Sequence, residues 1–307
     1  MDVETLALSQ LGIKLKKIGR EWHGACPVCR TGRDRFIVWK EGNYYCRQCG
    51  EKGFLKLDDS RKLSYNEIKA LMQQREEESK AARKKSLESW QSQLDLNKVM
   101  SWHNNLTPEM RIQWNNDGIP DYVLDSYCVG FNPTKWISVD GNMISVPAYT
   151  IPIVSNQTKK IVNIQFRLVN PPAGVGKYRQ VNEIPAAPAY MSEETEGDFL
   201  LIVEGWKKAV VVFNFIGKSF QVVGIPGIVV HPEIMESMRG FKKKVLMPDP
   251  FAVSDRKNLE NAVSRFKKYL SNVYLSTVLW KPDDMIVSGK VSLPQFNSIL
   301  DNARRIS

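Results

Sequence analysis

The sequence predicts an α+β protein of several domains, and three observations lead to this fold class. Two C-x-x-C pairs stand close together near the N-terminus, a long charged stretch follows them, and the last third alternates between short apolar runs and helical patterns. The chain of 307 residues is long enough for roughly two to three domains. We expect its parts to span residues 1–60, 61–100, 101–195 and 196–307.

The composition is that of a globular protein, with 43% apolar, 25% charged and 10% aromatic residues. The longest apolar runs, 199–203 and 209–216, are far shorter than the roughly 20 residues that span a bilayer. The N-terminus has no cleavable apolar segment, so we expect a cytoplasmic protein without membrane contact. The formal net charge of +10 suits a polyanion such as nucleic acid, the alternative being a basic surface without a ligand.

Four cysteines lie in one short window near the N-terminus. Cys26 and Cys29 form one C-x-x-C pair, and after sixteen intervening residues Cys46 and Cys49 form another. Each pair can direct two thiolates at one ion, so this spacing predicts a zinc ribbon. A disulfide pair or free buried thiols are the alternatives, but disulfides are rare in the cytosol. Four thiolates leave no open position, so the Zn²⁺ is expected to be structural.

The middle of the chain separates into a helical and a β-rich part. Residues 64–100 contain no glycine or proline and carry charges of both signs, which predicts one or two exposed helices acting as a linker. Residues 143–154 and 159–169 are strand-like runs separated by a polar turn. Arg167 and Lys177 in this β-rich part could line a groove for a nucleotide or template, or be ordinary surface charges.

The C-terminal third alternates strand-like and helix-like segments. The expected strands cover residues 199–203, 221–227, 244–247 and 273–280, and helical patterns separate them. This alternation predicts a mostly parallel sheet in a Rossmann-like α/β domain.

Acidic residues follow three of these expected strands. Glu204 follows the first, Asp249 the third, and the pair Asp283 and Asp284 the fourth. Ligands of such sheets bind beyond the carboxyl ends of the strands, and Mg²⁺ prefers carboxylate oxygens. The sequence therefore predicts a divalent-metal site here, the alternative being that each acid caps a helix or begins a loop.

Taken in order, these parts resemble the bacterial-type, DnaG-like primases and their phage and plasmid relatives over roughly residues 12–285. The four-cysteine segment is similar to the primase zinc-binding domain, and residues 118–131 are similar to the start of the catalytic core. Residues 161–169 with Lys177-Tyr178 resemble the motif of the basic N-terminal subdomain. VEGWKKAVVV (203–212) and VLMPDPF (245–251) resemble the two signatures of a Toprim domain.

The resemblance implies a DNA primase that synthesises short RNA primers on single-stranded DNA by metal-dependent nucleotidyl transfer. It implies that Glu204 is a metal ligand or general acid/base and that Asp249 holds Mg²⁺ or Mn²⁺ at the nucleotide phosphates. Arg167 and Lys177 would hold the template or the incoming NTP. The chain has no G-x-x-x-x-G-K-[ST] motif, so a replicative helicase is expected on a separate chain, and its compactness favours a phage or plasmid origin.

The sequence departs from the Toprim pattern at two places. Phe251 stands where the family usually has a second aspartate, and lysines at 207–208 replace an expected acid. Asp255, or the pair Asp283 and Asp284, could compensate by binding the cofactor. The alternative is a catalytically degenerate accessory protein that binds nucleic acid in a replication complex; a third is a Toprim nuclease or topoisomerase-like enzyme.

Overall fold

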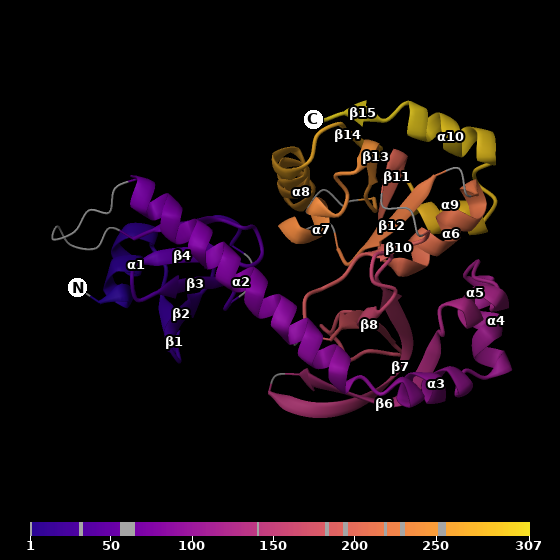
Figure 1. Ribbon diagram of the computed structural model, residues 1–307, viewed down its shortest axis with the longest axis horizontal. Coiled ribbons are helices and arrows are strands. Elements are labelled where there is room, and N and C mark those ends of the chain that lie inside the picture. The colour runs from indigo at the N-terminus through magenta and orange to yellow at the C-terminus, as the bar shows by residue number, and fades with distance from the viewer. Residues whose placement is uncertain are drawn as a thin grey trace. The chain divides into compact units, whose positions relative to one another are not determined.

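The chain has a mixed α+β fold with several sheets, as predicted (Figure 1). The structure is a computed structural model, and it describes residues 2–30, 33–55, 65–139, 141–181, 184–192, 196–217, 220–227, 231–250 and 256–307. It divides into two compact units, Met1–Ser79 and Lys80–Ser307.

The first unit combines one short helix, α1 (Val3–Leu11), with a five-stranded sheet. Its strands, each antiparallel to the next, are β1 (Leu15–Ile18), β2 (Glu21–Gly24), β3 (Phe36–Trp39), β4 (Asn43–Cys46) and β5 (Lys52–Phe54). The segment between the two cysteine pairs forms the antiparallel hairpin of β3 and β4. Only a small set of apolar side chains is buried, and three cysteines belong to it.

The charged stretch forms two helices, α2 (Tyr65–Gln93) and α3 (Leu96–Asn104), which confirms the helical prediction. They are separated at Asp95, whose side chain accepts a hydrogen bond from the Asn97 N–H and so caps α3. Two short helices follow, α4 (Pro108–Asn116) and α5 (Asp121–Ser126). None of the helices that the structure describes is long and apolar enough to cross a membrane.

The β-rich part is a four-stranded antiparallel sheet in chain order. Its strands are β6 (Gly130–Val139), β7 (Asn142–Val154), β8 (Ile161–Leu168) and β9 (Tyr178–Gln180). The two predicted strand runs correspond to β7 and β8. One face packs on α3 through Val99, and this core contains Val146, Ile164 and Phe166.

The C-terminal third forms a six-stranded sheet with the order β10-β12-β11-β13-β14-β15. The four central strands are parallel and the two edge strands are antiparallel. The strands are β10 (Ala189–Tyr190), β11 (Gly197–Glu204), β12 (Gln221–Ile225), β13 (Phe241–Met247), β14 (Val273–Leu275) and β15 (Arg304–Arg305). The expected mostly parallel sheet is therefore present.

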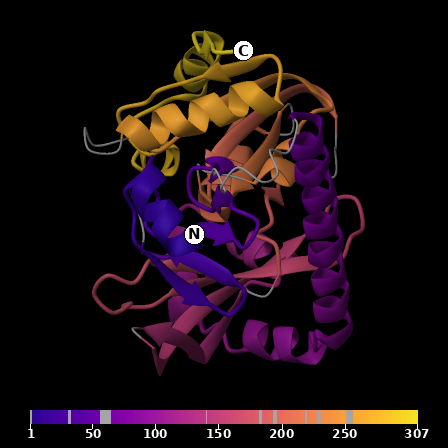
Figure 2. The same ribbon diagram turned by 90° about the vertical axis from the view of Figure 1, so that its left-hand side faces the viewer.

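Helices cover both faces of this sheet. The helices are α6 (Trp206–Ile216), α7 (Pro232–Glu236), α8 (Arg256–Tyr269), α9 (Pro282–Val287) and α10 (Leu293–Asp301). Alternate residues of β11 face opposite sides: Leu201 packs in the core that includes α6, α9 and α10, and Leu200 in the core that includes α7 and α8. Figure 1 shows the two helix layers on either side of the strands, and Figure 2 shows α8 lying across the sheet.

The expected fourth strand, 273–280, is too long. Strand β14 ends at Leu275, where its pairing with β15 also ends. The apolar residues that follow are not buried: Leu279 is 90% exposed, and the ammonium group of Lys290 lies 3.4 Å from the ring centroid of Trp280. An apolar run was therefore mistaken for a buried strand, and Asp283 stands in the first turn of α9 instead of at a strand end.

Candidate functional site

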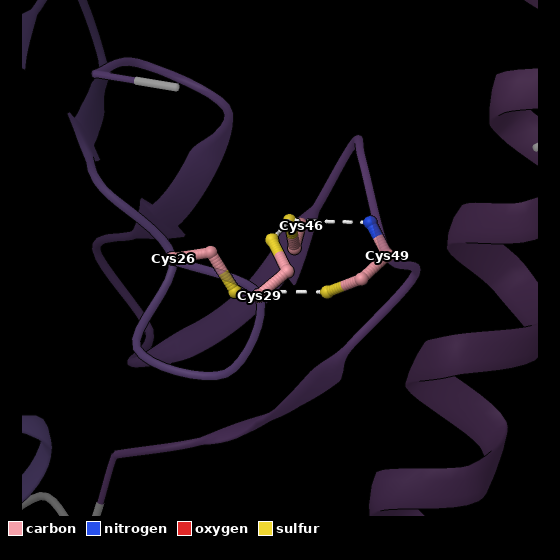
Figure 3. A group of neighbouring side chains, drawn as sticks. All are labelled: Cys26, Cys29, Cys46 and Cys49. Atoms are coloured by element: carbon pink, nitrogen blue, oxygen red, sulfur yellow. Dashed lines mark hydrogen bonds between the residues drawn. The ribbon is translucent and has the colours of Figure 1, made fainter. Parts of the chain in front are cut away.

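The first candidate site is a group of four cysteines in the N-terminal unit. Cys26 and Cys29 lie in the loop between β2 and β3, Cys46 ends β4, and Cys49 lies in the loop before β5 (Figure 3). Their sulfur atoms all lie within 4.8 Å of one another. The structure thus brings together all four predicted zinc ligands.

The geometry of these sulfur atoms fits tetrahedral zinc. Cys26 Sγ lies 3.6 Å from Cys49 Sγ, and Cys29 Sγ lies 3.8 Å from Cys46 Sγ. A tetrahedron with Zn–S bonds of about 2.3 Å has edges of about 3.8 Å, so a zinc ion fits between the four atoms. The N–H groups of Gln48 and Cys49 also donate to Cys46 Sγ, at 3.4 and 3.5 Å. Burial raises the pKa of Cys26 and of Cys49, and a bound cation would oppose this effect.

The second candidate site lies at the carboxyl edge of the six-stranded sheet. Strand β11 has β12 on one side and β13 on the other, so the strand order reverses beside it. Glu204 is the last residue of β11, and Asp249 follows β13 by two residues. Glu204 Oε1 accepts a hydrogen bond of 3.1 Å from the backbone N–H of Asp249. The two predicted acids therefore meet where ligands of such sheets bind.

Two glycines give the chain the tight turn that follows Glu204. Gly205 has φ +83°, and its N–H donates to Ile225 O at 2.7 Å. A Cβ atom on Gly224 would stand 2.6 Å from Gly205 O, so β12 can approach the turn this closely only without a side chain there. The turn starts helix α6 at once and puts its first lysines beside the acids.

Lys208, from the first turn of α6, contacts the carboxylate of Asp249 and the backbone carbonyl of Glu204. Its Nζ lies 3.1 Å from Asp249 Oδ2 and donates to Glu204 O at 3.0 Å. The other oxygen, Asp249 Oδ1, is buried and has no hydrogen-bond partner among the described residues. Carboxylate oxygens are the ligands that Mg²⁺ prefers, so this free oxygen fits one divalent cation. Within the described ranges, however, only the cysteines form a convergent group of three or more potential ligands.

A row of alternating charges extends from α6 to the antiparallel sheet. Lys207 Nζ lies 3.2 Å from Asp283 Oδ2 and 3.3 Å from Asp117 Oδ1, and Asp117 Oδ2 lies 3.0 Å from the guanidinium of Arg167. Asp283 is only 4% exposed. Burial favours the neutral amine, but the carboxylates of Asp283 and Asp117 outweigh it and raise the pKa of Lys207. We call these four residues the charge row.

Arg167 is held firmly in place. Its side chain is 9% exposed, and its guanidinium carbon lies 4.6 Å from the ring centroid of Trp114 and 5.9 Å from that of Tyr149. A guanidinium that stacks on aromatic rings and pairs with Asp117 is fixed in orientation. The structure therefore places Arg167 as a support of the site more than as an open phosphate ligand.

Lys177, the second predicted basic residue, is exposed and belongs to the same electrostatic neighbourhood. Partial desolvation lowers its pKa, and the positive charges of Arg167, Lys207 and Lys281 lower it further, while Asp117 opposes them. An exposed ammonium among other cations is available to an anionic ligand.

The pKa of Glu204 depends on burial and on neighbouring charges, as that of Lys177 does. Burial raises the pKa of Glu204 and the Asp249 carboxylate adds to this, whereas the Asp249 N–H, Lys208 and Lys281 oppose it. Lys281 thus acts on both Glu204 and Lys177, so the acids and the basic side chains share one region.

The three remaining predicted cofactor ligands, Asp283, Asp284 and Asp255, differ in whether they lie at the site. Asp283 joins the site, but its Oδ2 is taken by Lys207. Asp284 is exposed in the first turn of α9. Asp255, like Phe251, lies outside the described residues.

Two site residues, Asp117 and Lys281, escaped the sequence reasoning. Asp117 follows α4 as its C-cap, fifty positions before Arg167, and its neighbours Asn116 and Gly118 indicate only a turn. No local pattern signals such a partner.

The chain is similar to solved structures of bacterial primases. The zinc-binding and RNA polymerase domains of the Aquifex aeolicus primase match 99% of this chain and 84% of that chain, with a TM-score of 0.54 and 15% identity. The E. coli primase catalytic core matches 69% of this chain and 81% of that chain, with a TM-score of 0.54 and 16% identity. A DnaG primase catalytic domain bound to ssDNA matches 74% and 84%, with a TM-score of 0.55 and 14% identity.

No family model matches the chain, and no curated protein matches it in sequence. At these low identities the solved structures establish the fold. The resemblance to the zinc-binding and catalytic domains of DnaG-type primases, inferred from the sequence, is confirmed at that level.

Proposed function

We propose that this protein is a primase, a nucleotidyltransferase that synthesises short RNA primers on single-stranded DNA. The fold it shares with primase zinc-binding and RNA polymerase domains supports this, as does the formal net charge of +10. In this assignment, residues 1–60 are the zinc-binding domain, 61–100 the linker, 101–195 the basic subdomain of the core and 196–307 a Toprim domain.

The observation that carries the proposal is the contact between Glu204 and Asp249. Parallel strands β11 and β13 bring the two carboxylates to one edge of the sheet, beside the strand at which the order reverses. A half-buried glutamate and an aspartate with one free oxygen at this place are suited to metal-assisted phosphoryl chemistry.

The reaction joins a primer 3′-hydroxyl to an incoming NTP. The hydroxyl gives its proton to a general base, its oxygen forms a bond to the α-phosphorus, the α–β bridging P–O bond breaks, and pyrophosphate leaves. Bound Mg²⁺ or Mn²⁺ would supply Lewis-acid stabilisation of the charge on the phosphate oxygens. Asp249 would hold it through Oδ1, and Glu204 would act as second ligand or as general acid/base. Lys177, which is exposed, would hold the triphosphate or template, and Arg167 would add positive charge from its position beside Asp117.

The partners follow from the same assignment. Single-stranded DNA is the proposed template, and the matching DnaG catalytic domain was solved with ssDNA bound. The zinc ribbon would take part in template binding, and a replicative helicase on a separate chain remains a prediction.

A second candidate function has one observation in its favour. Lys208 pairs with Asp249 and Lys207 with Asp283, so the chain's own ammonium groups neutralise acids that would otherwise attract cations. A catalytically degenerate accessory protein that binds nucleic acid in a replication complex would show this pairing too.

Primer synthesis on mixed single-stranded DNA templates, with labelled NTPs and Mg²⁺ or Mn²⁺, tests the proposal. We expect short products from the unmodified protein and at least a roughly 100-fold loss in Glu204→Gln, because removing one electrostatic contact to the reacting groups typically costs this much. Glutamine is an isostere that can still accept the Asp249 N–H, so the fold is expected to survive.

Asp198→Asn is the matched control. Asp198 lies near the opposite end of β11 and pairs with Lys242 on the surface, so full synthesis is expected. Primer synthesis that persists in both Glu204→Gln and Asp249→Asn would overturn the assignment. Tight template binding with full zinc content and no products would favour the accessory function.

A further inference from the structure

The ammonium group of Lys208 lies beside two acidic residues, one at the end of β11 and one just after β13. Lys208 Nζ sits 3.1 Å from Asp249 Oδ2 and 3.0 Å from Glu204 O. The side chains of Lys208 and Asp249 are only 16% and 23% exposed, so water screens their attraction weakly. The ammonium is therefore a lasting part of the site.

Because of this ion pair, the two carboxylate oxygens of Asp249 have different roles. Asp249 Oδ2 pairs with the Lys208 ammonium group, whereas the buried Asp249 Oδ1 has no hydrogen-bond partner in the described part of the chain. Glu204 Oε1 accepts the hydrogen bond from the Asp249 N–H. The oxygens left over fit one divalent ion, whereas a second ion bridging the same carboxylates would be placed against the ammonium group.

Phosphoryl transfer at polymerase sites commonly uses two divalent ions roughly 3.5–4 Å apart, one on each side of the transferred phosphorus. A lysine ammonium can supply one of these positive charges, since lysine binds phosphate oxygens as a point charge. The neighbouring Lys207 is not available to bind phosphate, because its ammonium group already pairs with the carboxylates of Asp283 and Asp117. Lys208 has a single carboxylate partner among the described ion pairs.

We propose that Lys208 is the second cation of this site: it contacts the nucleoside triphosphate in place of a second divalent ion, and the site loads with one divalent ion only. This inference rests on the proposed function and specifies how its site binds the nucleotide.

The test measures binding, not catalysis. α,β-Methylene ATP, which resists cleavage at the α–β position, is titrated into the full chain by calorimetry in buffer cleared of free divalent ions on a chelating resin, with zinc content verified afterwards. We expect measurable binding to the unmodified protein and at least a tenfold loss of affinity in Lys208→Met. Lys242→Met, which removes an exposed lysine from the far end of β13, is expected to bind like the unmodified protein.

The second readout counts Mn²⁺ ions by electron paramagnetic resonance in the presence of the same analogue. One Mn²⁺ is expected per unmodified chain, and two per Lys208→Asp chain, because the new carboxylate replaces a repelling ammonium with a ligand. Two Mn²⁺ ions on the unmodified protein, or equal metal-free affinity in Lys208→Met, would overturn the inference.

These results separate the two proposals. A protein that makes primers while holding two Mn²⁺ ions contradicts the role of Lys208 and leaves the primase function standing. Lys208-dependent nucleotide binding with one Mn²⁺ but no primer synthesis supports the role of Lys208 and contradicts nucleotidyl transfer. Absence of nucleotide binding under all conditions contradicts both.

Discussion

Cys46→Ser is expected to release the zinc and unfold the N-terminal sheet while the second unit stays folded. The core of the first unit is small, and Cys26, Cys29 and Cys46 are themselves part of it. A unit of this size depends on its metal, and binding of structural zinc to comparable small modules contributes on the order of 10 kcal/mol to folding. Cys46 is fully buried at the end of β4. In Cys46→Ser, a side chain from the protein surface therefore cannot take the place of the lost thiolate as a zinc ligand.

Zinc content by elemental analysis and limited proteolysis of the full chain measure this effect. We expect one zinc ion per unmodified chain, less than a tenth of that in Cys46→Ser, and rapid cleavage confined to the first 55 residues. Cys128→Ser is the control, because Cys128 lies in the second unit, outside the four-cysteine group. Full zinc content in Cys46→Ser would refute the zinc site.

Lys207→Met is expected to lower the free energy of unfolding of the second unit by about 3 kcal/mol. The substitution removes the ammonium that pairs with Asp283, whose side chain is 6% exposed, and leaves that carboxylate buried without its counter-charge. Asp283 Oδ1 is already without a hydrogen-bond partner among the described residues, so the carboxylate cannot turn to another donor there.

Urea unfolding at neutral pH, followed by tryptophan fluorescence, measures this change because Trp114 and Trp206 lie in the core of the same unit. The double variant Lys207→Met/Asp283→Leu should regain most of the lost stability, since two apolar side chains replace the ion pair. Lys242→Met is the control: its pair with Asp198 is more than 80% exposed on both sides, and no measurable change is expected. An equal loss in Lys207→Met and in the double variant would show that the unpaired Asp283 carboxylate is not the cause of the loss.

The sequence alone determined the features whose signal is local. The spacing of Cys26, Cys29, Cys46 and Cys49 predicted the four-cysteine site because each C-x-x-C turn fixes its two thiolates within a few residues. Apolar runs predicted β11, β12 and β13, and their parallel order then implied that Glu204 and Asp249 would share an edge.

The sequence was less informative where burial depends on distant segments. It extended the last predicted strand to residue 280, but β14 ends at Leu275 because its edge partner β15 reaches only Arg304 and Arg305. Beyond it Leu279 and Trp280 are exposed, whereas Ser276 is buried and Val278 packs against the core, and nothing in such a run tells which part of it another segment will cover.

Only the tertiary structure decided which charges neutralise one another. Lys207 and Lys208 are adjacent in the sequence and alike in chemistry, yet the turn at Gly205 and the start of α6 send one to Asp283 and Asp117 and the other to Asp249. Such pairings join residues far apart in the chain and depend on side-chain direction. A Coulomb interaction in a half-buried site changes steeply over a few ångströms, and no sequence pattern fixes distances on that scale.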